Sequence, residues 1–155
     1  MNRQTSSRDT SGVLAFCYAF WAFASLGRAL YQYLFRHPET FMPTHISAFA
    51  ALLYLVIALL MASRSLRIWW MTLLLLVIEL AAVLIVGTID LIWQPFPYQS
   101  VWSAYGAGYF FMPLILPLVG LAWLLRPATR RAYAVTHDAR GVTPAAPARS
   151  DPGAP

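Results

Sequence analysis

Four long apolar stretches decide what this chain can fold into. They cover about residues 13–35, 46–63, 68–92 and 105–125. A transmembrane α-helix needs roughly 20 consecutive apolar residues to cross about 30 Å of hydrocarbon at 1.5 Å per residue. Because each stretch is near that length, the sequence predicts an all-α protein with four transmembrane helices.

The composition agrees with this class. Hydrophobic residues make up 59% of the 155 residues and charged residues 11%, whereas soluble domains carry about 25% charged residues. The one cysteine, Cys17, lies inside the first apolar stretch and has no second cysteine to pair with. A thiol with apolar neighbours is usually inert, so we expect Cys17 to be a small core residue.

The connections between the stretches are short, which favours antiparallel neighbours in a bundle. The predicted organisation is a polar N-terminal tail over 1–11, a four-helix transmembrane domain over 12–126 and a tail over 127–155. That last segment is rich in Arg, Pro and Ala and ends in "PAAPARSDPGAP". Such a composition buries no core, so we expect a disordered tail.

The arginines indicate the orientation in the membrane. Nine of the eleven basic residues lie in the N-terminal tail, the second connection or the C-terminal tail. The positive-inside rule therefore predicts a multi-pass protein of the cell membrane with both termini cytoplasmic. We expect an interfacial aromatic belt at the helix ends, made by Trp69, Trp70, Trp93, Trp102 and Trp123.

A cleaved signal peptide is the alternative for the first stretch. "VLAFCYAFWAFA" follows Arg3 and Arg8, and Ala22 and Ala24 form an A-x-A-like site. However, the apolar character continues to Phe35, beyond the length of a signal-peptide core, so a retained helix is favoured.

Polar residues inside the apolar stretches share helical faces. Thr72, Glu79 and Asp90 are seven and eleven residues apart, within about 20° of one another at 100° per residue. This spacing predicts an inward-facing polar stripe. In the first stretch, a second shared face is formed by Ser25, Arg28 and Gln32.

A charge at the centre of the bilayer needs a partner. Counted from the cytoplasmic boundary, Glu79 lies roughly 16 Å deep and Arg28 roughly 22 Å deep, and Tyr54 is at a similar level. An unpaired charge there costs about 2.5–3.5 kcal/mol. We therefore hypothesise an Arg28–Glu79 ion pair joined by the Tyr54 hydroxyl, which either fixes the helices or carries protons or ligands.

The fourth stretch contains Pro113 and Pro117, one turn apart. Each proline removes a helical hydrogen bond, so we expect a helix break at these positions. The break is either a simple kink or, as in some transporters, a source of free carbonyls for an ion.

No motif for catalysis, a cofactor or a metal is present, so we expect no enzyme, no cofactor and no metal site. His37, Glu39 and His45 share one connection but lack a recognised metal-ligand spacing. The net charge of +5 is concentrated in the C-terminal tail, which argues against a nucleic-acid partner. At the membrane surface, anionic lipid headgroups are the expected contacts of Arg126, Arg130 and Arg131.

Three segments resemble small four-helix integral membrane proteins common in actinobacteria: "GRALYQ" at 27–32, "ELAAVLIVGT" at 79–88 and "VWSAYGAGYFFMPLILPLVGLAWLL" at 101–125. The resemblance covers about residues 15–126. It implies a structural class and a host but no activity. That family often has acidic residues between its third and fourth helices, whereas "WQPFPYQS" here has none, which argues against a cation site in this loop.

Two functions remain open. The first is a non-enzymatic accessory or interaction subunit of a membrane assembly, with a membrane-protein partner or as a homo-oligomer. The alternative is a small oligomeric transporter or channel that uses Glu79 and Arg28. Small multidrug exporters also have four helices and a membrane Glu, but theirs lies in the first helix of a shorter chain.

Overall fold

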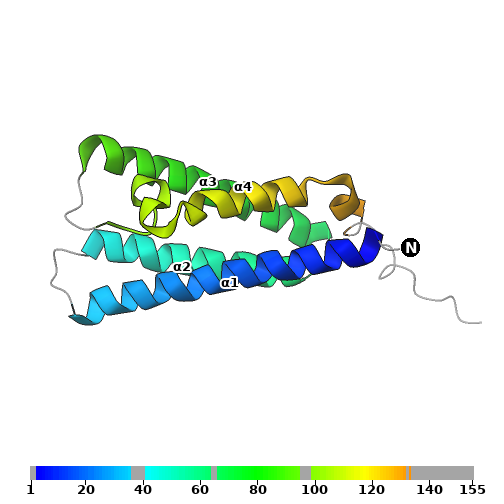
Figure 1. Ribbon diagram of the computed structural model, residues 1–155, viewed down its shortest axis with the longest axis horizontal. Helices are drawn as coiled ribbons and strands as arrows, with labels where there is room; N and C mark the ends of the chain where they lie inside the picture. Colours follow the sequence, from blue (N-terminus) through cyan, green and yellow to red (C-terminus); the bar gives the residue numbers. More distant parts are fainter. Residues whose placement is uncertain (1–2, 36–40, 64–65, 95–98, 132, 134–155) are drawn as a thin grey trace, which may run out of the picture.

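The computed structural model describes residues 3–35, 41–63, 66–94, 99–131 and 133. These residues form helices and no strand, which confirms the predicted all-α class. The elements are α1 (Arg3–Phe35), α2 (Phe41–Ala62), α3 (Leu66–Trp93), the 3₁₀-helix η2 (Ser103–Tyr109) and α4 (Met112–Leu124). Figure 1 shows that α1 to α4 run in alternating directions along one long axis.

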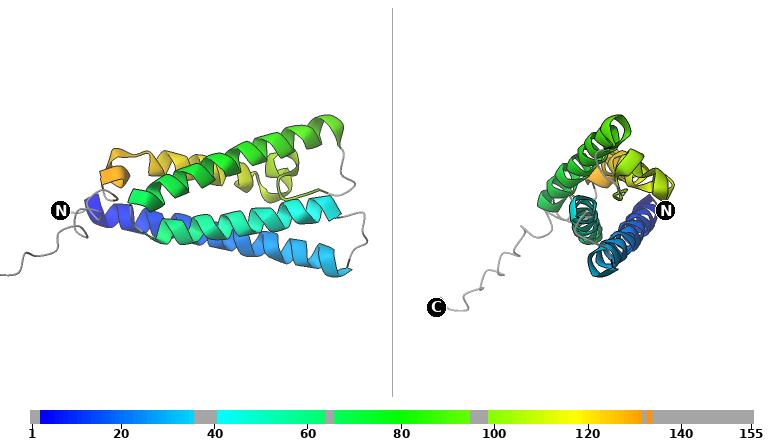
Figure 2. Two further views of the ribbon diagram at one scale, coloured as in Figure 1. Left: turned by 180° about the vertical axis from the view of Figure 1, so that it is seen from behind. Right: turned by 90° about the vertical axis from the view of Figure 1, so that its left-hand side faces the viewer.

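Three helices are long and apolar enough to cross a membrane, and the number is four if η2 and α4 together form one bent span. Viewed along the long axis, the helices surround a common interior (Figure 2). The N-terminal end of α1 and the C-terminal end of α4 lie at the same end of this bundle (Figure 1).

Helix α1 is longer than predicted. It begins at Arg3 and includes most of the segment that was predicted to be a polar tail. The segment contains no proline to stop the helix, and Ser11 is already buried against the bundle. With 33 residues, α1 is about 50 Å long, so it exceeds the thickness of the hydrocarbon layer.

The observed α3 agrees closely with its apolar stretch, whereas α2 begins at Phe41, in the segment predicted to be a connection. The polar face predicted for α3 is confirmed at two of its three positions. Thr72 and Glu79 both point into the interior and are fully buried. On α2, three small residues on one helix face are buried: Ser47, Ala51 and Ala58. Small side chains there allow α1 and α2 to approach closely.

The fourth span is not the continuous helix predicted over 105–125. Helices η2 and α4 meet at 98°, and the break lies at Phe110 and Phe111, which both have left-handed backbone angles. The expectation that Pro113 and Pro117 break the helix was therefore wrong in position. Pro113 lies in the first turn of α4, where its missing N–H has no helical acceptor to lose, and α4 continues through Pro117.

The first residues of the predicted disordered tail are folded. Residues 127–131 are helical, and both Thr129 and Tyr133 are buried. The disorder predicted for 127–155 is therefore wrong at its start, whereas residues 132 and 134–155 lie outside the described part of the chain.

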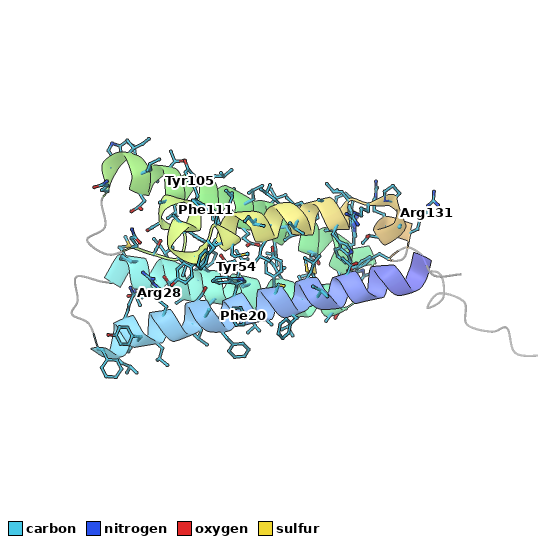
Figure 3. The ribbon with its side chains drawn as sticks, viewed as in Figure 1. Phe20, Arg28, Tyr54, Tyr105, Phe111 and Arg131 are labelled. Carbon is cyan, nitrogen blue, oxygen red and sulfur yellow. The ribbon has the colours of Figure 1, made fainter. Side chains whose placement is uncertain are left out.

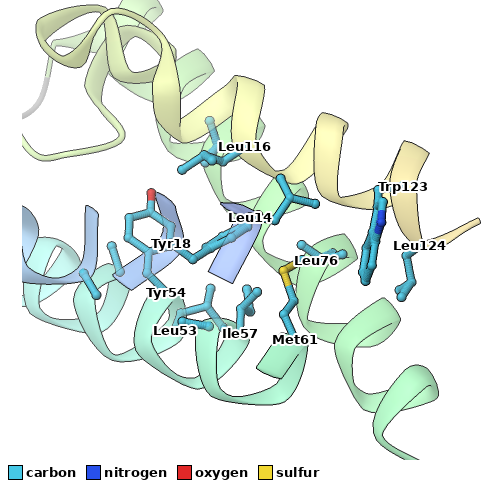
Figure 4. Packing of buried hydrophobic residues seen from close by; sticks show 14 of the residues in the cluster. Leu14, Tyr18, Leu53, Tyr54, Ile57, Met61, Leu76, Leu116, Trp123 and Leu124 are labelled. Carbon is cyan, nitrogen blue, oxygen red and sulfur yellow. The ribbon is translucent and has the colours of Figure 1, made fainter. Parts of the chain in front are cut away.

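The interior of the bundle is apolar toward the end that holds the N-terminus of α1. Side chains from all four helices meet there (Figure 4). The cluster includes Leu14, Ile57, Met61, Leu76 and Leu116. Gly120 brings α4 close to α3, because a Cβ added to it would lie 3.0 Å from the side chain of Leu76.

Three tryptophans that were expected in the interfacial belt are buried instead. The exposed fraction is 4% for Trp69, 2% for Trp102 and 4% for Trp123, against 60% for Trp70 and 71% for Trp93. The indole N–H of Trp69 donates to the carbonyl of Leu124 at 3.1 Å. A buried indole needs such an acceptor, and here the bond joins α3 to the end of α4.

Candidate functional site: a polar cluster inside the bundle

Glu79 lies at the centre of a buried polar cluster. Its side chain points inward from the middle of α3 and is fully buried. The hydroxyl of Tyr18, on α1, donates a hydrogen bond to Glu79 Oε2 at 3.0 Å. Because Tyr18 is also fully buried, this bond connects α1 to α3 in the interior.

Tyr54 joins the cluster from α2. Its ring packs edge-on against that of Tyr18, with 6.0 Å between the centroids and 64° between the ring planes. The indole Nε1–H of Trp102 donates to the Tyr54 hydroxyl at 2.8 Å. The sequence predicted that Tyr54 belongs to the polar cluster, and the structure adds that Trp102 is its hydrogen-bond partner.

Arg28 does not pair with Glu79, so the hypothesised ion pair was wrong. Its Nη1 donates to the Tyr109 hydroxyl at 2.7 Å, and its Nη2 donates to the backbone carbonyl of Gln99. The guanidinium also lies over the Tyr109 ring, 5.4 Å from the centroid. Arg28 is therefore bound through its two terminal nitrogens by the segment that precedes α4. It lies nearer the end of the bundle than Tyr54 (Figure 3).

Residues 99–109, which precede α4, fold against the end of the bundle that holds Arg28. Ser100 N–H donates to Ser103 Oγ at 2.8 Å, and the N–H of Val101 donates to Ser47 Oγ on α2 at 3.3 Å. These bonds hold residues 100–103 so that the indole of Trp102 enters the interior. Trp21 packs edge-on against Tyr109 with the centroids 5.6 Å apart, which adds a contact from α1.

The remaining polar residues predicted for the site lie apart from Glu79. Gln32 is buried and accepts a hydrogen bond from Thr44 Oγ1 at 3.3 Å. Asp90 is half-buried and is eleven residues further along α3 than Glu79, about 16 Å along the helix axis. The structure therefore brings Glu79 and Tyr54 together and leaves Arg28, Gln32 and Asp90 closer to the end of the bundle.

Sequence reasoning missed Tyr18, Trp102 and Tyr109. Tyr18 is seven residues before Ser25 on α1, so extending the polar face of that helix by two turns would have found it. Trp102 and Tyr109 had no such signal, because their positions depend on the left-handed residues that fold the chain back before α4.

A second group of predicted residues lies at the opposite end of the bundle. The guanidinium of Arg130 lies over the Trp69 ring, 5.3 Å from the centroid, while Arg126 and Arg131 are exposed. Figure 3 shows Arg131 at the far end of the molecule from Arg28. The three arginines thus form an exposed basic surface just after the C-terminal end of α4.

The cluster around Glu79 contains one carboxyl group and phenolic hydroxyls, which can bind protons and hydrogen-bonding groups. Among the described residues, no three His, Cys, Asp or Glu side chains are placed to hold a metal ion, and His37 and Glu39 lie outside the described ranges. No family model, curated protein or solved structure matches the chain. Function is therefore inferred from this geometry.

Proposed function

We propose that this chain is a multi-pass protein of the cell membrane that acts as a non-enzymatic interaction subunit, either with a membrane-protein partner or with copies of itself. The four-helix resemblance to actinobacterial membrane proteins is compatible with this role. The observation that carries the proposal is the row of exposed phenyl rings on α1.

Phe16, Phe20 and Phe23 follow one another at spacings of four and three residues, so they share one face of α1. Their exposed fractions are 72%, 58% and 70%. Aromatic side chains are enriched where proteins bind one another, and a row of three on one helix face presents a large apolar surface. The same helix uses its other face for Tyr18 and Arg28, so the rings are free to contact a partner.

The test is the mass of the tagged full-length protein extracted from its native membrane in mild detergent. A stoichiometric second protein, or a defined homo-oligomer, is the expected result. Changing Phe16, Phe20 and Phe23 together to alanine should release the partner without unfolding the bundle. A matched control replaces three exposed apolar residues of α3 by alanine: Leu74, Ile85 and Leu91. A wild-type protein that is monomeric and alone would contradict the proposal.

The orientation proposed for the chain has both termini in the cytoplasm. The support is the arginine distribution, together with the exposed Arg126, Arg130 and Arg131 at the end where α1 begins. Each such residue gains about 1 kcal/mol from anionic lipid headgroups. Reaction of cysteines introduced at either end with a membrane-impermeant reagent in intact cells tests this. Labelling of the end near Arg131 would contradict it.

A second candidate function is a small oligomeric transporter or channel, favoured by the buried carboxyl of Glu79. Such groups inside membranes are expensive and usually functional. In reconstituted vesicles, Glu79→Gln should abolish a pH-dependent flux while the protein stays folded. The absence of any flux from the wild-type oligomer would exclude this function.

A further inference from the structure

The interior of the bundle contains polar atoms with unused hydrogen-bonding capacity. Glu79 Oε1 and Ser25 Oγ have no partner among the described residues, although both side chains are fully buried. The Tyr54 hydroxyl accepts a bond from Trp102 but donates to no described acceptor. Leaving a buried polar atom unsatisfied costs about 1–3 kcal/mol, so such a group inside a membrane requires an explanation.

Among the described side chains, the groups that face Glu79 supply no positive charge. Tyr18 approaches it from α1 and donates to Oε2, and Tyr54 lies beside Tyr18 from α2. Helix α4 contains no ionisable residue. The guanidinium of Arg28, on α1, is bound to Tyr109 and to the carbonyl of Gln99. The group that completes the site must therefore bring a hydrogen or a positive charge of its own.

A proton fits this site better than a metal ion. Hard cations such as Ca²⁺ and Mg²⁺ take about six or more oxygen ligands. Here few oxygens have unused capacity, and Glu79 Oε1 is the one that belongs to a carboxyl group. A proton needs only one oxygen. It can pass from hydronium to Glu79 Oε1, which forms an O–H bond and leaves a neutral water molecule.

Among the described residues, the buried polar side chains nearest to Glu79 lie mostly toward the Arg28 end of the bundle. Between Glu79 and the Arg28 end lie Tyr54, Trp102 and the Ser100–Ser103 pair, which is joined at 3.1 Å between the two hydroxyl oxygens. In the other direction the interior is filled by the apolar cluster, including Leu76 and Met61 (Figure 4). A proton would therefore arrive from the Arg28 end.

Residues 99–111 cover this entry. Arg28 holds the segment at Gln99 and Tyr109, which are its first residue and the last residue of η2. Within the segment four non-glycine residues have positive φ: Ala104, Tyr105, Phe110 and Phe111. Each such conformation costs of order 1–3 kcal/mol, so the closed position depends on the bonds that hold it.

We propose that Glu79 is a proton-binding site that is entered from the Arg28 end of the bundle, with residues 99–111 as its cover and Arg28 as the latch. This inference names the substrate of the transport candidate and does not depend on the interaction role. It predicts that weakening the latch exposes Glu79, while the fold of the four helices remains.

The test is labelling by dicyclohexylcarbodiimide, an apolar reagent that modifies protonated carboxyl groups inside membranes. The full-length protein is reconstituted in vesicles, labelled over a range of pH, and the modified residue is located by peptide mass. We expect a label on Glu79 that declines as the pH rises, and no label at that position in Glu79→Gln. Asp90, half-buried on the same helix, should instead react with a water-soluble carbodiimide.

The latch is tested with Arg28→Ala, which should raise the rate of Glu79 labelling several-fold. Arg67→Ala removes an exposed cation at the other end of the bundle and should leave the rate unchanged. If Arg28→Ala does not fold, Tyr109→Phe removes one of the two Arg28 bonds and should show a smaller increase. An unlabelled Glu79 at every pH, or equal rates in wild type and the folded latch variant, overturns the proposal. Proton flux is measured separately, so labelling without flux would reject transport and retain the binding site.

Discussion

Tyr18 and Glu79 form a hydrogen bond inside the bundle. The hydroxyl of Tyr18 is the one described donor to the carboxyl group, and both residues have no exposed surface. Neither side chain can turn to water if the bond is lost. The pair therefore contributes to the packing of α1 against α3 beyond its apolar contacts.

We predict that Tyr18→Phe lowers the free energy of unfolding by about 1 kcal/mol, with an upper limit near 1.7 kcal/mol for hydrogen bonds between membrane helices. The reason is that Glu79 Oε2 loses its donor while the ring keeps its volume. Unfolding in mixed detergent, followed by circular dichroism, measures the change. Tyr31→Phe is the matched control, because Tyr31 is exposed on the same helix. Equal effects of the two variants would contradict the role of the buried bond.

The residues of the site could be found from the sequence only in part. Helical spacing placed Glu79 and Thr72 inside, and depth along the second stretch placed Tyr54 at the level of Glu79. The partner of Arg28 was not predictable, because the ion-pair argument compared depths along straight helices. Tyr109 and Gln99 reach Arg28 only because the chain folds back between η2 and α4.

At the scale of helices, η2 packs on α3 through one glycine. A Cβ added to Gly87 would lie 2.5 Å from Tyr105 Cδ1 and 2.7 Å from the Tyr105 backbone nitrogen. Those distances are too short for any side chain, and the backbone cannot move away alone. The Tyr105 hydroxyl also lies 3.0 Å from Thr88 Oγ1, which fixes the ring over α3.

We predict that Gly87→Ala destabilises the protein by about 1–3 kcal/mol, the usual cost of inserting atoms into a packed contact. The control is Gly27→Ala on α1, where an added Cβ meets nothing within 4 Å. Thermal unfolding of both variants in the same detergent compares them. If Gly87→Ala is as stable as Gly27→Ala, the close contact inferred between Gly87 and Tyr105 is contradicted.

Helix α3 and the C-terminal end of α2 were predictable because each belongs to a long apolar run with a clear limit. The limits of α1, the start of α2 at Phe41 and the limits of the last span were not. Polar residues at the start of α1 are compatible with helix, so hydropathy gave too late a beginning. In the last span, the prolines were expected to break the helix, whereas Pro113 lies in the first turn of the helix that follows the break.

At the scale of the whole molecule, residues 127–131 and Tyr133 close the end of the bundle that holds the N-terminus of α1. Thr129 and Tyr133 are buried there, and Arg130 stacks on Trp69. This end is thus held by residues that sequence composition assigned to a disordered tail.

We predict that truncation after Arg126 lowers the stability of the bundle by about 2 kcal/mol, from lost aromatic burial and the lost Arg–Trp contact. Truncation after Tyr133 should leave stability near that of the full chain. The midpoint of unfolding in detergent distinguishes the two. If both truncations behave alike, the buried positions of Thr129 and Tyr133 do not contribute to the fold.

The position of Glu79 midway along the bundle has a consequence for membrane voltage. A proton that moves from the Arg28 end to Glu79 crosses roughly half of the hydrocarbon, hence about half of the transmembrane field. Moving one charge across the whole membrane is worth about 2.3 kcal/mol per 100 mV. Each 100 mV therefore changes the free energy of proton binding at Glu79 by about 1 kcal/mol, which is a several-fold change in the binding constant. In the proposed orientation, with the Arg28 end outside, the inside-negative potential of a living cell draws protons toward Glu79. We then expect the site to be more fully protonated in an energised membrane than in a detergent micelle.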